Sequence, residues 1–418
     1  MTNQLFKKLI FCLLAGCLCL NLCACSLTDT GIDELMRPPQ LTQSRQQVQL
    51  AIENILGTSY QLISPSGGNH RSGINLEDLN GDGQAEAICF FTIGDIHLLD
   101  LLVLQKTEKG WEQMGKFSSD ATNVDRVEFS DLNGNGQKEL IIGWSYLTGS
   151  DKIMEILQLE QGRLSSRYKE KYSQFAIADS QAVVVDQSAA AATLLGYNHN
   201  KIVSLSSVPI DPHISSFVSL TVSKTTAGDP AVYMDTQLED RSYHTEILVI
   251  SGKKYLENKL FTDETLHNAR PYSIRCTDID GDGIPEVPAT SPMENGDAAA
   301  YYTTWSKFSG AALTDPVVTY TTVSDQFYLE YPKAWRGKVF VRQDSKMQRL
   351  YHFIDQKEEI LYSLRVFTVT EYSQISASDG WITLIESTDK VIAYKIGKTD
   401  ATKLTLTTAE WAAALHTY

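Results

Sequence analysis

Three short acidic segments of this chain share the pattern Asp-x-[Asp/Asn]-Gly-[Asp/Asn]-Gly-x-x-Glu, and they begin at Asp78, Asp131 and Asp278. Oxygen atoms at positions 1, 3, 5 and 9, with the main-chain carbonyl of position 7, can surround a hard cation, and Gly at position 6 permits the sharp turn. The pattern therefore predicts three calcium loops. The expected ligand positions are Asp78, Asn80, Asp82, Gln84 and Glu86, then Asp131, Asn133, Asn135, Gln137 and Glu139, and finally Asp278, Asp280, Asp282, Ile284 and Glu286.

The residues after each loop distinguish it from a helical EF-hand, which needs a bidentate Glu at loop position 12 and an amphipathic helix on either side. Position 12 holds Cys89, Ile142 and Ala289. Apolar, partly β-branched runs follow the first two loops, at 87–91 and 140–144, and such runs are typical of buried strands. We therefore expect a unit of strand, acidic turn and strand.

The loops are spaced like members of a longer repeat. Their starts are separated by 53 and 147 residues, and the second gap is three times a period of about 49. Two repeats without ligands are expected in that gap, at 175–185 and at 218–233, where Ser223 replaces the leading Asp. Such a period, with about four short strands per repeat, is typical of propeller blades. We predict a mainly β fold with a five-bladed β-propeller over residues 58–320.

The three loops resemble the D-x-[DN]-x-[DN]-G-x-x-[DE] calcium loops of FG-GAP/VCBS repeats in integrin-α-like β-propellers. The Phe-Gly and Gly-Ala-Pro elements of those repeats are absent, and Glu86, Glu139 and Glu286 replace the more common Asp at position 9. The resemblance implies a calcium-binding propeller, and the overall layout is similar to that of VCBS-type lipoproteins of Gram-positive bacteria.

The first 24 residues have the organisation of an export signal. A basic pair at 7–8 precedes an apolar run at 9–22, which is too short for a stable membrane span. Leu-Cys-Ala-Cys25 then resembles the lipobox of bacterial lipoproteins, in which cleavage before the Cys leaves a thiol that is diacylated. We expect Cys25 to anchor the chain at the extracytoplasmic face of the cell membrane. The alternatives are Cys17, which leaves a shorter apolar region, and an ordinary secretory signal.

Residues 25–57 are expected to hold the lipid anchor, a polar tether over 26–41 and a short helix. Thr42 can serve as the N-cap of this helix and Gly57 as its C-terminal stop. The residues that recur on its apolar face are Val48, Ile52, Ile55 and Leu56.

Residues 321–418 are predicted to form a second, small α+β domain. Apolar residues alternate with polar ones at 327–331 and again at 360–366, which predicts strands. Thr407 and Glu410 form a capping box for a short final helix. The Tyr-Pro-x-x-Trp sequence that ends the first of these strands resembles the entry of small sandwich domains of the PsbP/Mog1 type.

The mature chain has only Cys89 and Cys276 besides the anchor, because five of the seven cysteines lie within residues 12–25. This number excludes a disulfide framework. Two buried apolar thiols are the favoured interpretation, and one disulfide between them is the alternative.

The charge balance argues against nucleic acid as a partner. The formal net charge is −15, and loss of the basic pair at 7–8 makes it −17, with 34 Lys and Arg against 51 Asp and Glu. No basic run offsets this balance, so a phosphate backbone would be repelled. The sequence also has no histidine metal spacing, no Gly-x-Ser-x-Gly elbow and no phosphate-binding glycine loop, so no catalytic residue is predicted.

The functional hypothesis is a non-enzymatic, membrane-anchored lipoprotein whose calcium-stabilised propeller binds an extracellular protein or a cell-wall glycan. One alternative is a polysaccharide- or peptidoglycan-active enzyme on a propeller scaffold, which would use a pair of carboxylates. Another places the function in residues 321–418. The number of charged ligands predicts that calcium affinity is highest in the third loop, then the first, then the second.

An insertion at 291–297 is followed by Tyr301, Tyr302 and Trp305. Aromatic side chains of a strand core are the favoured interpretation of these three residues. An acidic and aromatic patch for a sugar or peptide is the alternative, because propeller loops often carry function.

Overall fold

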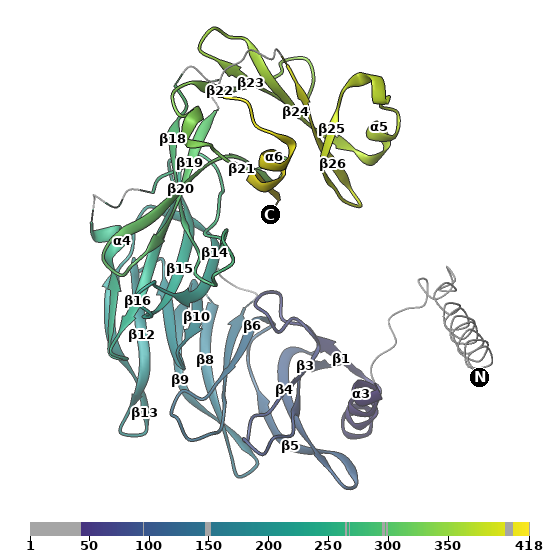
Figure 1. Ribbon diagram of the computed structural model, residues 1–418. Coiled ribbons are helices and arrows are strands. Elements are labelled where there is room, and N and C mark those ends of the chain that lie inside the picture. Colours follow the sequence, from purple (N-terminus) through teal and green to yellow (C-terminus); the bar gives the residue numbers. More distant parts are fainter. Residues whose placement is uncertain are drawn as a thin grey trace, which may run out of the picture. The chain divides into compact units, whose positions relative to one another are not determined.

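The structure is a computed structural model that describes residues 43–94, 96–146, 152–263, 266, 268–294, 297, 300–397 and 404–417. The predicted export signal, tether and lipidation residues Cys17 and Cys25 lie outside the described residues. The described part is mainly β and is built from antiparallel sheets (Figure 1). Residues 43–59 with Lys106–Glu112 form one compact unit, and the remaining residues form the other.

The helix predicted before the sheets is α3 (Gln43–Leu56). It ends at the predicted stop, because Gly57 has a φ of +78° and its N–H donates to the Glu53 carbonyl at 2.9 Å. Val48 and Ile52 are buried, as the periodicity predicts, whereas Ile55 is 38% exposed. Thr42, the expected N-cap, lies outside the described residues.

The first two sheets each carry a predicted calcium loop. The first sheet contains β1 (Tyr60–Ile63), β2 (Ile74–Glu77), β3 (Glu86–Ile93), β4 (Ile96–Thr107) and β5 (Gly110–Ser118). The second contains β6 (Asn123–Ser130), β7 (Glu139–Ser145), β8 (Lys152–Glu160) and β9 (Arg163–Tyr172). Strands β1 and β2 both pair with β3, and the other strands pair in chain order. The acidic loops connect β2 to β3 and β6 to β7, which confirms the predicted unit of strand, turn and strand.

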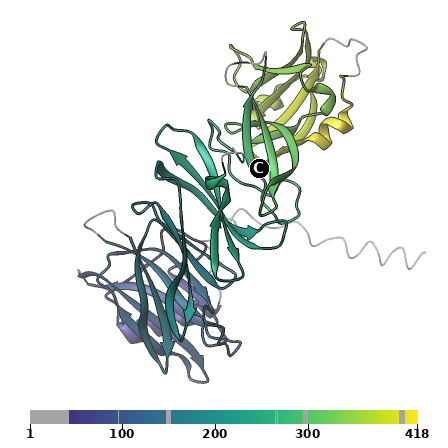
Figure 2. The same ribbon diagram turned by 90° about the vertical axis from the view of Figure 1, so that its left-hand side faces the viewer.

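The third and fourth sheets contain the two repeats that were predicted to lack ligands. The third is formed by β10 (Gln174–Ala178), β11 (Gln181–Asp186), β12 (Ala191–Asn198) and β13 (Lys201–Pro209). The fourth is formed by β14 (Ile214–Lys224), β15 (Pro230–Leu238), β16 (Tyr243–Ser251) and β17 (Tyr255–Asn258), and the short helix α4 (Lys259–Thr262) follows it. Hairpins β10–β11 and β14–β15 confirm the predicted strand pairs at 175–185 and 218–233, and long antiparallel hairpins of this kind are visible in Figure 2.

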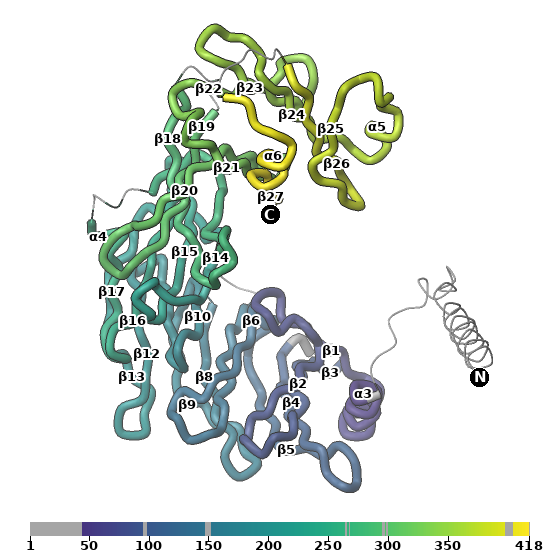
Figure 3. The backbone as a smooth tube through the Cα atoms, viewed as in Figure 1, coloured from purple at the N-terminus to yellow at the C-terminus, as the bar shows by residue number. Residues whose placement is uncertain are grey.

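The last two sheets include the C-terminal end of the chain. The fifth sheet contains β18 (Val287–Pro292), β19 (Tyr301–Phe308), β20 (Leu313–Thr322), β21 (Phe327–Glu330) and β27 (Leu415–Thr417). The sixth contains β22 (Val339–Gln343), β23 (Leu350–Asp355), β24 (Ile360–Thr368), β26 (Lys390–Ile396) and β25 (Ile382–Glu386), in this spatial order. Strand β27 pairs with β21, so the end of the chain returns to the fifth sheet (Figure 3).

Short helices connect the strands of this C-terminal part. They are the 3₁₀ turns η1 (Lys333–Trp335) and η2 (Ala377–Asp379) and the α-helices α5 (Val369–Ser373) and α6 (Thr408–Ala414). The predicted capping box of α6 is confirmed, because Thr407 Oγ1 accepts from Glu410 N at 3.3 Å and Thr407 N donates to Glu410 Oε2 at 2.7 Å. The predicted change of character at residue 320 falls within β20, and the sixth sheet begins at Val339.

Apolar side chains of consecutive sheets share cores. Leu140, Ile142 and Trp144 of β7 join the core with the first sheet, whereas Ile141 of the same strand joins the core with the third sheet. Successive side chains of a strand point to opposite faces, so a sheet that is covered on both faces needs an uninterrupted apolar run. The run at 140–144, which predicted a buried strand, meets this requirement.

The other sheets follow the same arrangement. The third and fourth sheets share one core, the fourth and fifth share a second, and the fifth and sixth share a third that is rich in aromatic side chains. The structure thus establishes a mainly β fold with several four- or five-stranded antiparallel sheets, and no closed barrel or propeller is identified among the described residues.

Candidate metal centre

The leading aspartate of each acidic loop accepts the same two main-chain hydrogen bonds. In the first loop, Asp78 Oδ1 accepts from Gly81 N at 2.7 Å and Asp78 Oδ2 accepts from Gly83 N at 2.9 Å. Asp131 and Asp278 accept the equivalent pair of bonds from the glycines at positions 4 and 6 of their own loops, at 2.7–2.8 Å. One carboxylate therefore closes the turn in each of the three loops.

The two glycines of each loop make this closure possible. All six have a φ between +75° and +86°, a conformation that residues with a Cβ rarely adopt. The sequence pattern predicted this requirement at position 6, and the structure shows the same requirement at position 4. The sequence pattern therefore specifies left-handed backbone conformations at positions 4 and 6 as well as the expected ligands.

Positions 3 and 5 form two further turns in which a side-chain oxygen accepts from the N–H two residues later. In the first loop, Asn80 Oδ1 accepts from Asp82 N at 2.8 Å, and Asp82 Oδ1 accepts from Gln84 N at 2.7 Å. The equivalent bonds in the other two loops measure 2.8–3.3 Å. The residues at position 7, Gln84, Gln137 and Ile284, contribute their N–H groups to these turns, and the calcium prediction assigns their carbonyl groups to the metal.

The glutamate at position 9 connects each loop to the strand that follows. Glu86, Glu139 and Glu286 are at most 2% exposed. The Oε2 atom of each accepts from the N–H at loop position 2, at 2.8–2.9 Å. Burial raises the pKa of all three carboxyl groups above the ordinary value for Glu, because it disfavours the charged form. A cation beside them would offset this cost.

The first and second loops contact each other. Lys138 N of the second loop donates to the Leu79 carbonyl of the first at 2.8 Å. A Cβ placed on Gly81 would lie 2.3 Å from the Gly136 carbonyl oxygen, so only Gly fits there. A cavity of about 660 Å³ lies beside this contact and is lined by both loops and by the turn between β8 and β9. This contact could not be predicted from local sequence patterns, because the starts of the two loops are separated by 53 residues.

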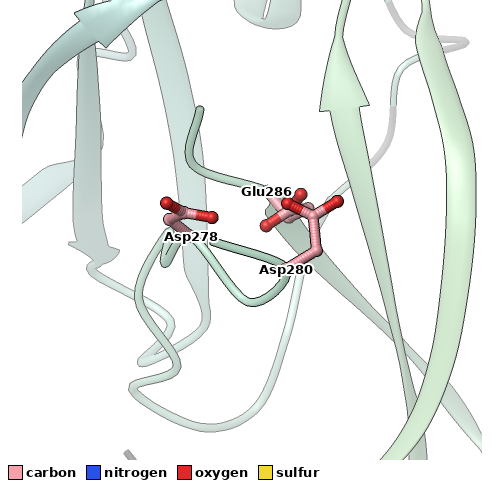
Figure 4. Close-up of side chains that lie close together, drawn as sticks. All are labelled: Asp278, Asp280 and Glu286. Atoms are coloured by element: carbon pink, nitrogen blue, oxygen red, sulfur yellow. The ribbon is translucent and has the colours of Figure 1, made fainter. Parts of the chain in front are cut away.

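The third loop brings three carboxylates together (Figure 4). Asp278, Asp280 and Glu286 each offer a carboxylate oxygen, and these atoms lie within 4.8 Å of one another. Among the described residues, these three side chains lie close enough together to hold a metal ion. Oxygen donors of this kind suit a hard cation such as Ca²⁺.

Lys307 on β19 contacts the same loop, and the sequence analysis did not identify it. Its Nζ lies 2.6 Å from Asp280 Oδ2, pairs with Asp282 and lies 3.6 Å from Glu286 Oε1. The hydrogen bonds to Asp280 and Asp282 raise the pKa of Lys307, and the bond from Lys307 lowers the pKa of Asp282. The third loop therefore contains a positive charge supplied by the protein.

The pairing register of β18 and β19 explains why Lys307 lies beside this loop. Val287 on β18 pairs with Ser306 on β19, so one further step places Lys307 opposite Glu286. The same step places Gln105 opposite Glu86 in the first sheet and Gln158 opposite Glu139 in the second. The sequence concealed this correspondence, since Lys307 follows its Glu by 21 residues and the two glutamines follow theirs by 19. In the described residues, no Lys, Arg or His side chain forms an ion pair with the carboxylates of the first two loops.

The other sequence predictions near these loops have mixed outcomes. Cys89 and Cys276 are buried free thiols, as favoured, and burial raises the pKa of Cys89 to about 12. Trp305 is 2% exposed, which agrees with the core interpretation, whereas Tyr301 and Tyr302 are half-buried. Part of the insertion at 291–297 lies outside the described residues.

A second cavity lies between the first strands of three sheets. Its volume is about 420 Å³, and β6, β10 and β14 contribute most of its lining. Arg126 at its wall donates to the Phe175 carbonyl and to Gln174 Oε1, both at 2.9 Å. Glu128 also lines the cavity, and burial raises the pKa of its carboxyl group. The cavity thus combines charged and aromatic side chains.

The fold and the loops define the structural class of this protein. It is a mainly β protein of successive antiparallel sheets, with recurrent acidic turns between paired strands. In comparisons with known proteins, no family model matches the chain, and no curated protein matches its sequence. In the described residues, no helix has the length and apolar character needed to cross a membrane.

Proposed function

We propose that this chain is a lipid-anchored, extracytoplasmic binding protein whose β-sheets are stabilised by calcium and present a surface to an extracellular protein or a cell-wall glycan. The observation that carries the calcium part is the hydrogen-bond arrangement common to the three loops. It holds oxygen atoms of positions 1, 3, 5 and 9 around one turn in each case. The export signal and the lipobox-like Cys25, with Cys17 as the alternative, support the location.

The first five sheets are then blades of FG-GAP/VCBS-like propeller repeats. Two features support this proposal. Each of these sheets contains a meander of four antiparallel strands, and consecutive sheets share an apolar core, as neighbouring blades do.

Calcium would act on stability rather than on catalysis. Each loop crowds carboxylates into one turn and buries the last of them, so a bound cation favours the folded state. For a site with a dissociation constant of about 0.1 mM in about 1 mM calcium, the gain is ~1.4 kcal/mol. Several such sites are a substantial part of the stability of an ordinary domain.

The partner surface that we favour is the 420 Å³ cavity between β6, β10 and β14. Arg126 and Glu128 offer hydrogen bonds and charge, and Phe175 and Phe217 offer apolar contact. Concave sites that combine apolar walls with a few polar groups are typical ligand sites. A sugar or a peptide side chain would meet both kinds of contact there.

Thermal melting tests the calcium part of the proposal. The chain from Ser26 onward should melt at a higher temperature in millimolar calcium than in EDTA. Asp78→Ala and Asp131→Ala should each lose part of this shift, while Glu108→Ala, an exposed acidic residue outside the loops, should retain it. The same melting temperature with and without calcium, together with metal analysis that finds no bound calcium, would refute it.

Sedimentation with purified cell walls tests the partner. The wild-type chain should sediment with the walls, and Asn69→Ala at the cavity should reduce the bound fraction without changing the melting temperature, because Asn69 is exposed. Acylation of the full-length chain, followed with a labelled fatty acid, should be lost in Cys25→Ser and retained in Cys17→Ser. The reverse result would identify Cys17 as the anchor.

A further inference from the structure

We propose that Lys307 acts as a built-in cation of the third loop, so that this loop closes without metal and calcium binds at the first and second loops. The inference rests on the proposed calcium function. It reverses the order of affinity that the number of charged ligands predicts.

The position of the ammonium group is the first argument. Lys307 contacts the side chains at positions 3, 5 and 9 of the third loop, which are three of the expected metal ligands. The Lys307 side chain is 14% exposed, while Asp280 and Asp282 are 48% and 41% exposed. The Lys307 side chain is thus largely covered, and its ammonium group contacts carboxylate oxygens that a metal ion would also bind.

The comparison among the three loops is the second argument. Position 3 and the residue opposite position 9 change together within this one chain. The pairs are Asn80 with Gln105, Asn133 with Gln158, and Asp280 with Lys307. A carboxylate occurs at position 3 only in the loop that has the ammonium group. Asp280 is therefore explained as the partner of Lys307 rather than as an additional calcium ligand.

Once Lys307 is counted, the net charge no longer ranks the third loop above the first. The first loop has three carboxylates (Asp78, Asp82 and Glu86), and the second has two (Asp131 and Glu139). The third has four, and Lys307 reduces their net charge to −3, which equals that of the first loop. A calcium ion in the third loop would have to displace the ammonium group, because two positive charges at such close range repel each other.

Calcium stoichiometry tests the proposal. Equilibrium dialysis should find two calcium ions per wild-type chain and three per chain for Lys307→Gln, which gives the third loop the residue found opposite the other two. Lys307→Arg keeps the charge and should still bind two. The double variant Asn80→Asp/Gln105→Lys transfers the pair to the first loop and should reduce the number from two to one.

Melting in EDTA provides a second readout. Lys307→Gln leaves the carboxylates of the third loop without a cation, so it should melt at a lower temperature than the wild type in EDTA. Calcium should remove this difference, because it can bind at the third loop of the variant. The variant at the first loop keeps the proposal testable if Lys307→Gln fails to fold.

The outcomes separate this proposal from the calcium function itself. Three ions bound to the wild-type chain would refute the role of Lys307 and leave the calcium function in place. Equal numbers in wild type and Lys307→Gln, with equal melting temperatures in EDTA, would also refute it. No binding to the wild type but one ion bound to Lys307→Gln would support the role of Lys307 and remove the calcium function of the first two loops. No binding to either protein would refute both.

Discussion

Replacement of Gly81 by Ala would test the contact between the first and second loops. A Cβ at this position would lie 2.3 Å from the Gly136 carbonyl oxygen, and real Cβ atoms essentially never approach a neighbour within 3.0 Å. Gly81 also has a φ of +77°. The substitution therefore combines backbone strain with a steric clash between the two loops.

Gly134 separates these two effects, because it occupies the same position of the second loop. Its φ is +75°, and a Cβ there would meet nothing within 4 Å. Gly134→Ala should cost only the left-handed conformation, about 1–2 kcal/mol. Gly81→Ala should cost this amount plus about 1–3 kcal/mol for forcing apart packed groups. The expected loss is thus ~2–5 kcal/mol for Gly81→Ala.

Urea unfolding, followed by tryptophan fluorescence, would measure the two losses. Trp144 reports on this region, since it is fully buried in the core shared by the first two sheets and its Nε1 donates to Glu155 Oε2 at 2.8 Å. Hydrogen exchange at the Lys138 amide, which donates to Leu79, should accelerate in Gly81→Ala and stay unchanged in Gly134→Ala. Equal losses of stability in the two variants would refute the contact.

Three further predictions concern other parts of the chain. The fully buried guanidinium of Arg270 lies 2.7 Å from the Asp235 carboxylate. Asp235→Ala would leave this guanidinium without a carboxylate, so it should lower the free energy of unfolding by about 3–5 kcal/mol in urea titrations. Thr407→Ala should cost about 1 kcal/mol by removing the N-cap of α6, whereas Thr407→Ser should not. Burial raises the pKa of Glu128, so the stabilisation from its protonation is present below its ordinary pKa of 4.5 and is lost as the pH rises through the higher folded-state pKa. Glu128→Gln resembles the protonated form, so its stability relative to wild type, measured by urea titration, should increase as the pH rises above 4.5.

Features that depend on neighbouring residues could be predicted from the sequence. The acidic turns, the end of α3 at Gly57 and the capping box of Thr407 each involve residues that are at most a few positions apart. Apolar runs such as 140–144 also predicted strands that are buried on both faces. These features depend on local hydrogen bonds or on side-chain alternation, and both follow from the order of neighbouring residues.

Features that depend on packing between distant segments could not be predicted. Lys307 is separated from Asp280 by 27 residues, and Gly136 is separated from Gly81 by 55, so neither contact has a local signal. Spacing predicted a propeller because it counts repeats, but the way in which the sheets are arranged in space depends on contacts that spacing does not contain. The same limit means that a count of charged ligands in the sequence could not include Lys307.

The proposed assignment of calcium to the first two loops and of Lys307 to the third predicts that the first two sheets and the fifth sheet respond differently to removal of calcium. The first and second loops contact each other and have Gln105 and Gln158 at the register position where the third loop has Lys307. If the ammonium group closes the third loop, removal of calcium should loosen the first two sheets and leave the fifth unchanged. Hydrogen exchange in EDTA should therefore increase at 78–86 and 131–139 and stay constant at 278–286, whereas Lys307→Gln should extend the increase to the third loop. Equal acceleration in all three loops of the wild-type chain would mean that Lys307 does not replace the metal.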